Sequence, residues 1–375
     1  MQPNRVLPGA TIGIIGGGQL GRMMATAAKH MGYRVVVLDP TEDCPTAQVS
    51  DEHIVRAYDD IEAIKQLNEK SDVITYEFEN VDLKAAQFLE ESGKLPQGAE
   101  LLRTTQDRDQ EKSIMTELRL PVAPFSIVEN TNNLKAALKL IARPAVLKTC
   151  RGGYDGKGQL KIETEANLDE AIQLVNNNDR CMLEQWVDFD KEISVVLTRA
   201  MTGEITFFPV AENEHKNHVL HKTLAPARVS QTVTNKAIEL ARSIANGIGV
   251  VGTFAIEMFV SGDEVYLNEM APRPHNSGHY TIEACNVSQF EQHIRAICGL
   301  PLIPIAFHGA AIMVNLLGKD VDDALARIEE YPAAHIHVYG KKETKPGRKM
   351  GHMTFIDKEL EKLQQIVSET QEETV

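Results

Sequence analysis

Residues 151–159, RGGYDGKGQ, are the most informative stretch of this sequence because four of them, within a span of seven, are glycine. The stretch follows a short apolar run, residues 145–147, that ends at Lys148. Glycine is unfavourable inside a helix or strand, since it loses backbone entropy there and has no side chain to pack. A glycine loop can instead close its N–H groups over phosphates, and Lys148 and Lys157 would add positive charge. The alternative is a hairpin turn, which needs only about two to five loop residues.

Length and composition indicate a globular protein of two or three domains. The chain has 375 residues, and a domain usually takes about 100–200. The net charge of −14 argues against a protein that binds a DNA or RNA backbone. The five cysteines show no CxxC spacing, which predicts free thiols in a reducing compartment. We find no signal-peptide core and no run of about 18 apolar residues, so we expect a cytoplasmic protein that does not bind a membrane.

The N-terminal residues predict a Rossmann-like unit. A strand at 11–15, the turn GGGQLG at 16–21, a helix and a second strand follow one another and end at Asp39. In a dinucleotide-binding protein the glycines of this turn would hold a pyrophosphate and Asp39 a ribose. Pro40 and the loop after it weaken that interpretation. A helix N-terminus that binds another phosphate, or no ligand, remains open.

Three further stretches carry acids in places where a ligand could bind. Glu77 and Glu79 follow a strand at 72–76, where they would contact a ligand or lie in the first turn of a helix. Glu184 lies on a predicted strand at 181–187, where an acid and an amide could hold an adenine. That strand could equally be a core strand with a surface acid.

The third stretch is a predicted hairpin, 252–260 and 265–270, that places Glu257 and Glu269 on apolar strands. A buried carboxylate is costly unless it is paired or binds a metal, so the two acids could hold one or two Mg²⁺ ions. Asn268 and Asn276 could add neutral oxygens. The alternative is a pair of strand-edge acids that face solvent. The stretch RPHNSGH at 273–279 favours an anion site beside a metal.

A basic run at 339–352 stands out in this acidic chain. It could be a solvated turn, which is the usual role of a charge run. It could also bind a substrate phosphate as a second cluster of cations.

Together these features resemble the ATP-grasp superfamily, and more closely the N5-carboxyaminoimidazole ribonucleotide synthetases of bacterial purine biosynthesis. The resemblance rests on five motifs in order over nearly the whole chain: GGGQLGRM, TYEFEN, GGYDGKGQ, NEMAPRPHNSGHY and PGRKMGH. It implies an α/β and α+β fold with a Rossmann-like domain at 1–115, a two-part ATP-grasp domain at 116–302 and a small β-rich C-terminal domain at 303–375 with an acidic tail. The ATP-grasp domain would have a small lid part at about 120–188 and a larger part at about 189–302.

The resemblance also implies an activity. A member of this family would be an ATP-dependent ligase that carboxylates the exocyclic amine of 5-aminoimidazole ribonucleotide with bicarbonate, through carboxyphosphate. It would need ATP and Mg²⁺ or Mn²⁺, would form a homodimer, and would bind no nucleic acid and no membrane.

The residue roles below are those that the resemblance implies. The ATP site would comprise Arg108, Lys148, Gly153, Tyr154, Asp155, Gly156, Lys157, Gly158, Gln159, Glu184, Gln185, Trp186, Val187, Glu192, His215, Asn268 and Glu269. The substrate site would comprise Gly18, Gln19, Leu20, Glu77, Tyr154, Asp155, Arg273, His275, Asn276, Lys341, Arg348 and Lys349. The metal ligands would be Glu257 and Glu269, and the catalytic residues would be Asp155, Lys157, Arg273, His275 and Lys349. Lys157 stands where some relatives carry arginine, and it lacks the planar fork of that side chain. Asp155 or His275 would handle the proton of the amine.

Three other functions are weighed against this one. A formate-dependent glycinamide ribonucleotide transformylase shares the architecture, but the HNSGHY and PGRKMGH stretches favour the carboxylating enzyme. An NAD-dependent oxidoreductase would leave the glycine loop and the pair Glu257 and Glu269 without a role. A nucleotide-sensing protein would bind ATP without turning it over.

Overall fold

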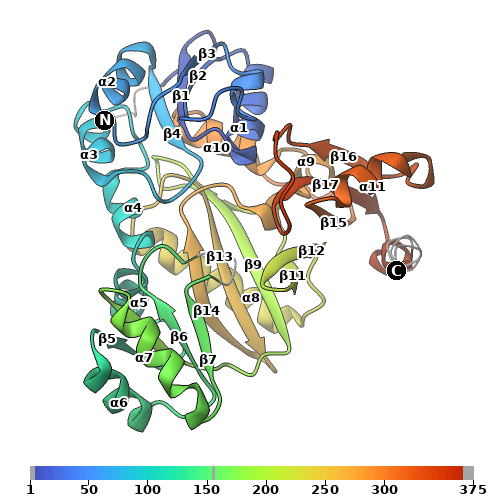
Figure 1. Cartoon of the computed structure of the whole chain (residues 1–375). Helices are drawn as coiled ribbons and strands as arrows, with labels where there is room; N and C mark the ends of the chain where they lie inside the picture. Colours follow the sequence, from blue (N-terminus) through green and yellow to red (C-terminus); the bar gives the residue numbers. More distant parts are fainter. Residues whose placement is uncertain (1–4, 154–156, 366–375) are drawn as a thin grey trace.

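The N-terminal part of the computed structural model is a parallel sheet with helices packed on it, as expected of a Rossmann-like unit (Figure 1). The structure describes residues 5–153 and 157–365. The sheet has the order β3-β2-β1-β4. Its elements are β1 Thr11–Ile15, α1 Gln19–His30, β2 Arg34–Leu38, η1 Ala47–Val49, β3 Glu52–Ile54, α2 Ile61–Lys70 and β4 Val73–Tyr76. All its strand pairs are parallel, which places the segments that follow β1 and β4 at the same edge of the sheet.

Three helices lead from this sheet to the rest of the chain: α3 Leu83–Glu91, α4 Ala99–Thr105 and α5 Arg108–Glu117. Asp82 caps α3 and Asp107 caps α5, each through a side-chain oxygen that accepts from a backbone N–H of the first turn. Helix α3 carries no acid in its first turn. Glu77 and Glu79 therefore precede the helix, and the interpretation of these acids as helix-terminal residues is wrong.

A second, antiparallel sheet of four strands has the order β5-β8-β6-β7, and helices α6 and α7 pack on it. Its elements are β5 Phe125–Val128, α6 Thr131–Leu140, β6 Ala145–Thr149, β7 Gln159–Ile162, η2 Glu165–Asn167, α7 Leu168–Asn176 and β8 Cys181–Gln185. The glycine stretch joins β6 to β7, which pair directly from Lys148 and Gln159 onward. It is therefore a hairpin connection, but a long one that covers residues 150–158.

The largest sheet has nine strands and runs through the second half of the chain in the order β14-β13-β9-β11-β12-β15-β17-β16, with β10 on β9. Its first strands are β9 Lys191–Arg199, β10 Ile205–Phe207, β11 Ala211–Lys216, β12 Val219–Ala225, β13 Gly252–Ser261 and β14 Glu264–Ala271. Helix α8 Gln231–Gly247 covers one face through Val233, Ala237, Ala241 and Ile244. After β14 come η3 Asn276–Gly278, α9 Thr281–Ala284 and α10 Gln289–Ile297, and α10 packs against both β13 and α1.

The C-terminal strands continue this large sheet instead of forming a separate one. They are β15 Ala310–Leu317, β16 His335–Val338 and β17 Lys349–Asp357, with α11 Asp320–Ala326 and η4 Ile328–Glu330 between them. Strand β15 pairs with β12 from Ala311↔Ala225 to Val314↔Lys222. The C-terminus is β-rich as expected, whereas the exact limits of the three domains remain a prediction. No helix within 5–153 and 157–365 is long and apolar enough to span a bilayer.

Candidate active site

The two acids of the β13–β14 hairpin face each other. Strand register pairs Glu257 with Glu269 on one side and with Ser194 of β9 on the other. The Glu257 side chain is 18% exposed and that of Glu269 is 41% exposed. Burial and the nearby Glu269 raise the pKa of Glu257. The partly buried position of Glu269 opposes its ionisation, but Arg108 and Lys148 outweigh that effect and lower its pKa. The pair thus has the strong mutual repulsion that a bound cation would relieve.

A β-bulge explains how Asn268 and Glu269, which are adjacent in sequence, can both serve this site. The register of the hairpin shifts between Glu257↔Glu269 and Met258↔Leu267, so Asn268 is the extra residue. The buried positions of β14 change spacing at the same point, from Val265 and Leu267 to Met270. A bulge bends its strand and redirects a side chain, and here it interrupts the alternation in which Asn268 would otherwise face away from Glu269.

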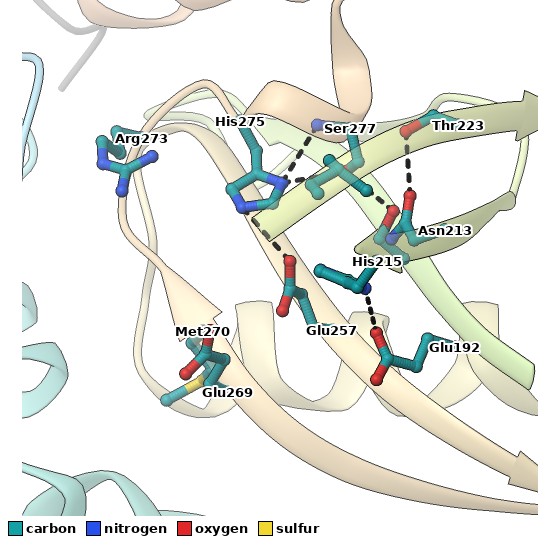
Figure 2. Close-up of polar contacts among 12 residues, drawn as sticks. Glu192, Asn213, His215, Thr223, Glu257, Glu269, Met270, Arg273, His275 and Ser277 are labelled. Carbon is teal, nitrogen blue, oxygen red and sulfur yellow. Dashed lines mark hydrogen bonds and ion pairs between the residues drawn. The ribbon is translucent and has the colours of Figure 1, made fainter. Parts of the chain in front are cut away.

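Glu192 and His215 form a second acidic and basic pair beside Glu257. The Nδ1 of His215 lies 2.5 Å from a carboxylate oxygen of Glu192 (Figure 2). A second bulge, between Glu214 and His215, alters the register of β11 at this residue. Burial alone would lower the pKa of His215, but the hydrogen bond to Glu192 and the charge of that carboxylate raise it. His215 therefore carries positive charge more readily than an ordinary histidine.

Glu184 lies between two lysines in the lid part. Its carboxylate is 2.8 Å from the ammonium of Lys112 on α5 and 2.5 Å from that of Lys148 on β6. Burial opposes ionisation of Glu184, yet the two lysines lower its pKa to about 2. Lys112 is only 1% exposed and also donates to the backbone oxygen of Leu267, 3.3 Å away. This ion triad connects the lid sheet, α5 and the strand that carries Glu269.

Helix α5 contributes two more contacts to the same region. Arg108 donates to Glu269 over 3.1 Å, and the backbone N–H of Met270 donates to Glu111 over 2.5 Å. At the start of the helix, Asp107 binds Arg151 at 2.9 Å, which ties the first residue of the glycine loop to α5. The sequence prediction included Arg108 and missed Asp107, Glu111 and Lys112. All three look like ordinary polar helix residues in the sequence, and only their burial distinguishes them.

The described part of the glycine loop is closely packed at its base. The N–H of Thr149 donates to the oxygen of Gly158 over 2.8 Å, and a Cβ atom on Gly158 would lie 2.6 Å from the Thr149 hydroxyl. Gly158 also has a φ of +71°, which favours glycine. Lys157 is exposed and Gln159 begins β7. The predicted Tyr154, Asp155 and Gly156 lie outside the described residues.

The predicted adenine segment follows β8. The N–H groups of Gln185 and Trp186 donate to the backbone oxygens of Pro124 and Pro144. These two amides are therefore used within the chain. The ammonium of Lys161 lies 4.3 Å from the Trp186 ring centroid and forms a cation–π contact with it. Glu184 is buried within the triad, so the alternative interpretation of this residue as a surface acid is wrong. Val187 follows Trp186 in the loop after β8.

The loop after β14 brings Arg273 and His275 to the acids. Arg273 donates to Glu79 of the N-terminal unit over 2.8 Å. His275 points toward Glu257, with its Nε2 3.3 Å from a carboxylate oxygen (Figure 2). Its Nδ1 lies 2.8 Å from the Ser277 hydroxyl. Burial, Arg273 and Lys349 lower the pKa of His275 to about 3, so the ring is neutral. Asn276 is 7% exposed, and among the described residues neither polar atom of its amide has a hydrogen-bond partner. Such a buried amide is suited to a ligand.

The glycine turn after β1 is occupied by acids of the same chain. Glu77 accepts from the N–H groups of Gly18 and Gly21, the latter at 2.8 Å. Asp39 accepts from the N–H of Gly17 at 2.7 Å and is 5% exposed, so it is not placed to hold a ribose. Gln19 is partly exposed, whereas Leu20 is 7% exposed and belongs to the core. A substrate contact at Leu20 could therefore involve its backbone only.

The basic run forms the connection between β16 and β17. Lys341 donates to the oxygen of Lys349 over 2.7 Å, and Arg348 donates to the oxygen of Glu343 over 2.8 Å. Lys341, Arg348 and Lys349 are partly exposed, while the residues between 342 and 347 are exposed. The positive charge of Lys349 lowers the pKa of both His215 and His275, so this lysine lies near the two histidines of the acidic site. The structure thus brings Lys349 to the site from the far end of the chain.

Comparison with known proteins agrees with this geometry. Family models match the chain as a ribonucleotide synthetase preATP-grasp domain at residues 9–106, an ATP-grasp domain at 113–290 and a phosphoribosylaminoimidazole carboxylase C-terminal domain at 311–366. The chain is 51% identical over 357 residues to the N5-carboxyaminoimidazole ribonucleotide synthase of Bacillus subtilis (strain 168), covering 95% of this chain and 94% of the relative. The chain belongs to the N5-carboxyaminoimidazole ribonucleotide synthase family.

Two solved structures of synthases support the same membership. The enzyme of Staphylococcus aureus, complexed with ADP, is 46% identical, with a TM-score of 0.94 and coverage of 97% of this chain and 98% of that one. The synthase of Aspergillus clavatus, in complex with ADP and 5-aminoimidazole ribonucleotide, is 31% identical, with a TM-score of 0.89 and coverage of 96% of both chains. As a member of this synthase family with an ATP-grasp domain, the chain is an ATP-dependent ligase.

Proposed function

We propose that this chain carboxylates the exocyclic amine of 5-aminoimidazole ribonucleotide, using ATP and bicarbonate, to give N5-carboxyaminoimidazole ribonucleotide. The observation that carries the proposal is the pair of acids Glu257 and Glu269. This pair lies next to the loop that carries Arg273 and His275 (Figure 2). This arrangement supports a phosphate-handling site at the two acids beside a cationic site for an anionic substrate. Bicarbonate is a poor electrophile, and its phosphorylation to carboxyphosphate would activate it for attack by the amine.

The ATP side of the site would lie between the lid sheet and the β13–β14 hairpin. Lys148 pairs with Glu184 and Arg108 pairs with Glu269, and each cation would also bind phosphate oxygens of ATP. The glycine loop would close over the phosphates with its backbone N–H groups and exclude water from a labile intermediate. Asn268, Glu192 and His215 complete the predicted ATP set at the same end of the sheet.

The residues present fit a divalent cation. Glu257 and Glu269 lie opposite each other, and burial together with the charge of Glu269 raises the pKa of Glu257. The β-bulge at Asn268 lies next to the two acids. Within 5–153 and 157–365, no group of three or more His, Cys, Asp or Glu side chains is placed to hold a metal. Two carboxylates suit Mg²⁺ or Mn²⁺, since Mg²⁺ takes its other ligands from water and substrate phosphates. When bound, the ion would neutralise the charge of the transferring phosphoryl group.

The ribonucleotide would bind between the N-terminal unit and the loop after β14. Positive charge for its phosphate would come from Arg273, Lys341, Arg348 and Lys349, and Asn276 offers a buried amide without a hydrogen-bond partner in the described part of the chain. Glu77 and Gln19 lie at the glycine turn across from this loop. A homodimer remains a prediction from the resemblance, and a cytoplasmic location remains a prediction from the sequence.

The hydrogen bonds of His275 indicate which of its ring nitrogens carries the proton, and this limits the roles that it can have in the reaction. The N–H of Ser277 points at its Nδ1, 3.3 Å away, so Nδ1 accepts and Nε2 carries the proton toward Glu257. A neutral ring in this tautomer has no free lone pair for the amine proton. We therefore assign His275 to the orientation of Glu257, and Asp155, which lies outside the described residues, becomes the preferred proton acceptor.

The test is ADP release with ATP and Mg²⁺, with bicarbonate and aminoimidazole ribonucleotide added singly and together. Strong release that requires both additions is the expected result. Turnover with formate and glycinamide ribonucleotide would assign the chain to the transformylases instead. No ADP under any condition would favour a sensor, and titration with NAD would then test the oxidoreductase, against which the occupied Asp39 already argues.

A further inference from the structure

A ring of buried hydrogen bonds includes the backbone of the loop that carries Arg273 and His275. Its side chains come from β4, from the segment between α3 and α4, from α10 and from the start of β13, so it joins the N-terminal unit to the large sheet and its helix. The side-chain members are Thr75, Gln97, Thr253, Gln289 and His293, each at most 5% exposed. None of them is a predicted site residue, and the proposed reaction assigns them no chemical step.

On the side of His275, the ring is formed by Gln289, which is the first residue of α10. Its side-chain oxygen accepts from the N–H of His275 over 2.9 Å, and its side-chain nitrogen donates to the oxygen of His275 over 2.7 Å. The amide thus pairs with both backbone groups of one residue, as a neighbouring β-strand would. Gly278 makes room for it, because a Cβ atom there would lie 2.5 Å from the Gln289 oxygen.

On the side of Pro272, the ring is formed by Gln97, which precedes α4. Its nitrogen donates to the oxygen of Pro272 over 3.0 Å, and its oxygen accepts from the Thr75 hydroxyl over 2.6 Å. Thr75 lies on β4, two residues before Glu77. Gln97 therefore ties the loop to the strand that leads into the predicted substrate residues of the N-terminal unit.

His293 and Thr253 close the ring between the two glutamines. The N–H of Thr253 donates to Nδ1 of His293 over 3.0 Å, and Nε2 of His293 lies 2.8 Å from the Thr75 hydroxyl. The hydroxyl of Thr253 donates to the backbone oxygen of Gln289 over 3.0 Å. Thr253 lies four residues before Glu257 on β13. The donors and acceptors of these bonds can be assigned consistently around the ring, with a neutral His293 that accepts at Nδ1 and donates from Nε2.

We propose that Gln289 and Gln97 are positioning residues for the reaction, which set the loop of Arg273 and His275 relative to both Glu257 and the N-terminal substrate residues. This proposal rests on the proposed function. The two glutamines hold backbone atoms on either side of Arg273, so they fix the conformation of the loop without using the side chains of Arg273 and His275. Buried polar networks of this kind specify one arrangement when all members are satisfied.

The chain offers a matched control in Gln292, which lies on the same helix and is equally buried. Its amide bonds to Ile303 and Thr206, away from the loop. Gln289→Met and Gln292→Met each remove one buried amide and should lower the melting temperature by similar amounts. Only Gln289→Met should lower ribonucleotide-dependent kcat, by about tenfold or more, with the KM for ATP within about twofold of wild type. Gln97→Met should reproduce the effect if Gln289→Met does not fold.

Hydrogen exchange gives a second measurement that does not depend on activity. The amide of His275 should exchange much faster in Gln289→Met than in wild type and remain protected in Gln292→Met. Equal losses of kcat in both variants, or an unchanged His275 amide, would overturn the proposal. If the wild type consumes no ribonucleotide, the proposed function fails, and the exchange experiment alone decides whether the ring holds the loop.

Discussion

Glu257 and Glu269 are directly opposite each other across the β13–β14 hairpin, and the residue before Glu269 is the extra residue of a β-bulge. Two carboxylates in this arrangement repel each other when both are ionised. The short distance between the two carboxylates suits a bound cation, but it destabilises the folded protein when no cation is bound. Stability and activity should therefore respond in opposite directions to removal of one charge.

We predict this outcome for Glu257→Gln. The variant should melt at a higher temperature than wild type at pH 7 without divalent ions, because it removes a carboxyl group whose ionisation is opposed by burial and by Glu269, and it keeps an acceptor for His275. ADP release with all substrates should fall by about 100-fold or more. Glu264→Gln, on the same hairpin but exposed, is the control and should change neither property by much. A destabilised Glu257→Gln protein would contradict the argument.

The buried Glu184 predicts a pH dependence of stability. Lys148 and Lys112 outweigh burial and lower its pKa to about 2, below the ordinary value of 4.5. A carboxyl with a lowered pKa in the folded state stabilises the fold above pH 4.5, and this contribution is lost as pH falls toward 2. At 1.36 kcal/mol per pKa unit it amounts to about 3 kcal/mol.

Urea unfolding from pH 6 to pH 3 would check this prediction. The difference in unfolding free energy between wild type and Glu184→Gln should be large at pH 6 and shrink as pH falls below 4.5. Glu100→Gln, which breaks an exposed pair with Arg103, should change stability by less than about 1 kcal/mol throughout. A constant difference for Glu184→Gln would count against the ion triad.

The ion pair between Glu79 and Arg273 joins the N-terminal unit to the loop after β14. Glu79→Gln should raise the KM for the ribonucleotide by about tenfold, since hydrogen bonds to charged groups are worth about 1.5–3 kcal/mol. The KM for ATP should stay near wild type. A double-mutant cycle with Arg273→Met should show strong coupling. Additive effects would mean that the pair does not act as a unit.

His275→Ala should remove carboxylation more than ATP binding. The imidazole holds Glu257 through Nε2, so its loss should lower kcat by about 100-fold while the affinity for ATP, measured by calorimetry, changes little. Ser277→Ala removes the hydroxyl next to Nδ1 but leaves the ring, and it should have a smaller effect. Wild-type carboxylation by His275→Ala would end the assigned role.

Local sequence patterns were sufficient for most of the secondary structure. The predicted strand at 11–15 is observed as β1, and the predicted hairpin of 252–260 and 265–270 is observed as β13 and β14. Both rest on short-range rules, namely apolar periodicity and turn residues. Strand β11 was missed because Glu212, Glu214, His215 and Lys216 make its sequence polar. Pairing with β9 and β12 overrides that composition.

The parts of the site that escaped prediction depend on long-range contacts. Lys112 occurs in an ordinary polar helix sequence, and only its contacts with Glu184 and Leu267 give it a role. Gln289 looks like a helix-start residue, and its partner His275 lies fourteen positions earlier. The opposite error concerns Asp39, whose place after a strand suggested a ribose contact. Its carboxylate instead binds the glycine turn of its own chain.

The pairing of β12 with β15 has a consequence for the integrity of the molecule. A chain that ended near residue 302 would leave the backbone N–H and C=O groups of β12 exposed as an open edge. Open edges recruit strands from other molecules and promote aggregation. The C-terminal strands therefore protect the catalytic sheet from self-association in addition to carrying Lys349, and the last unit cannot be removed or exchanged as an independent module.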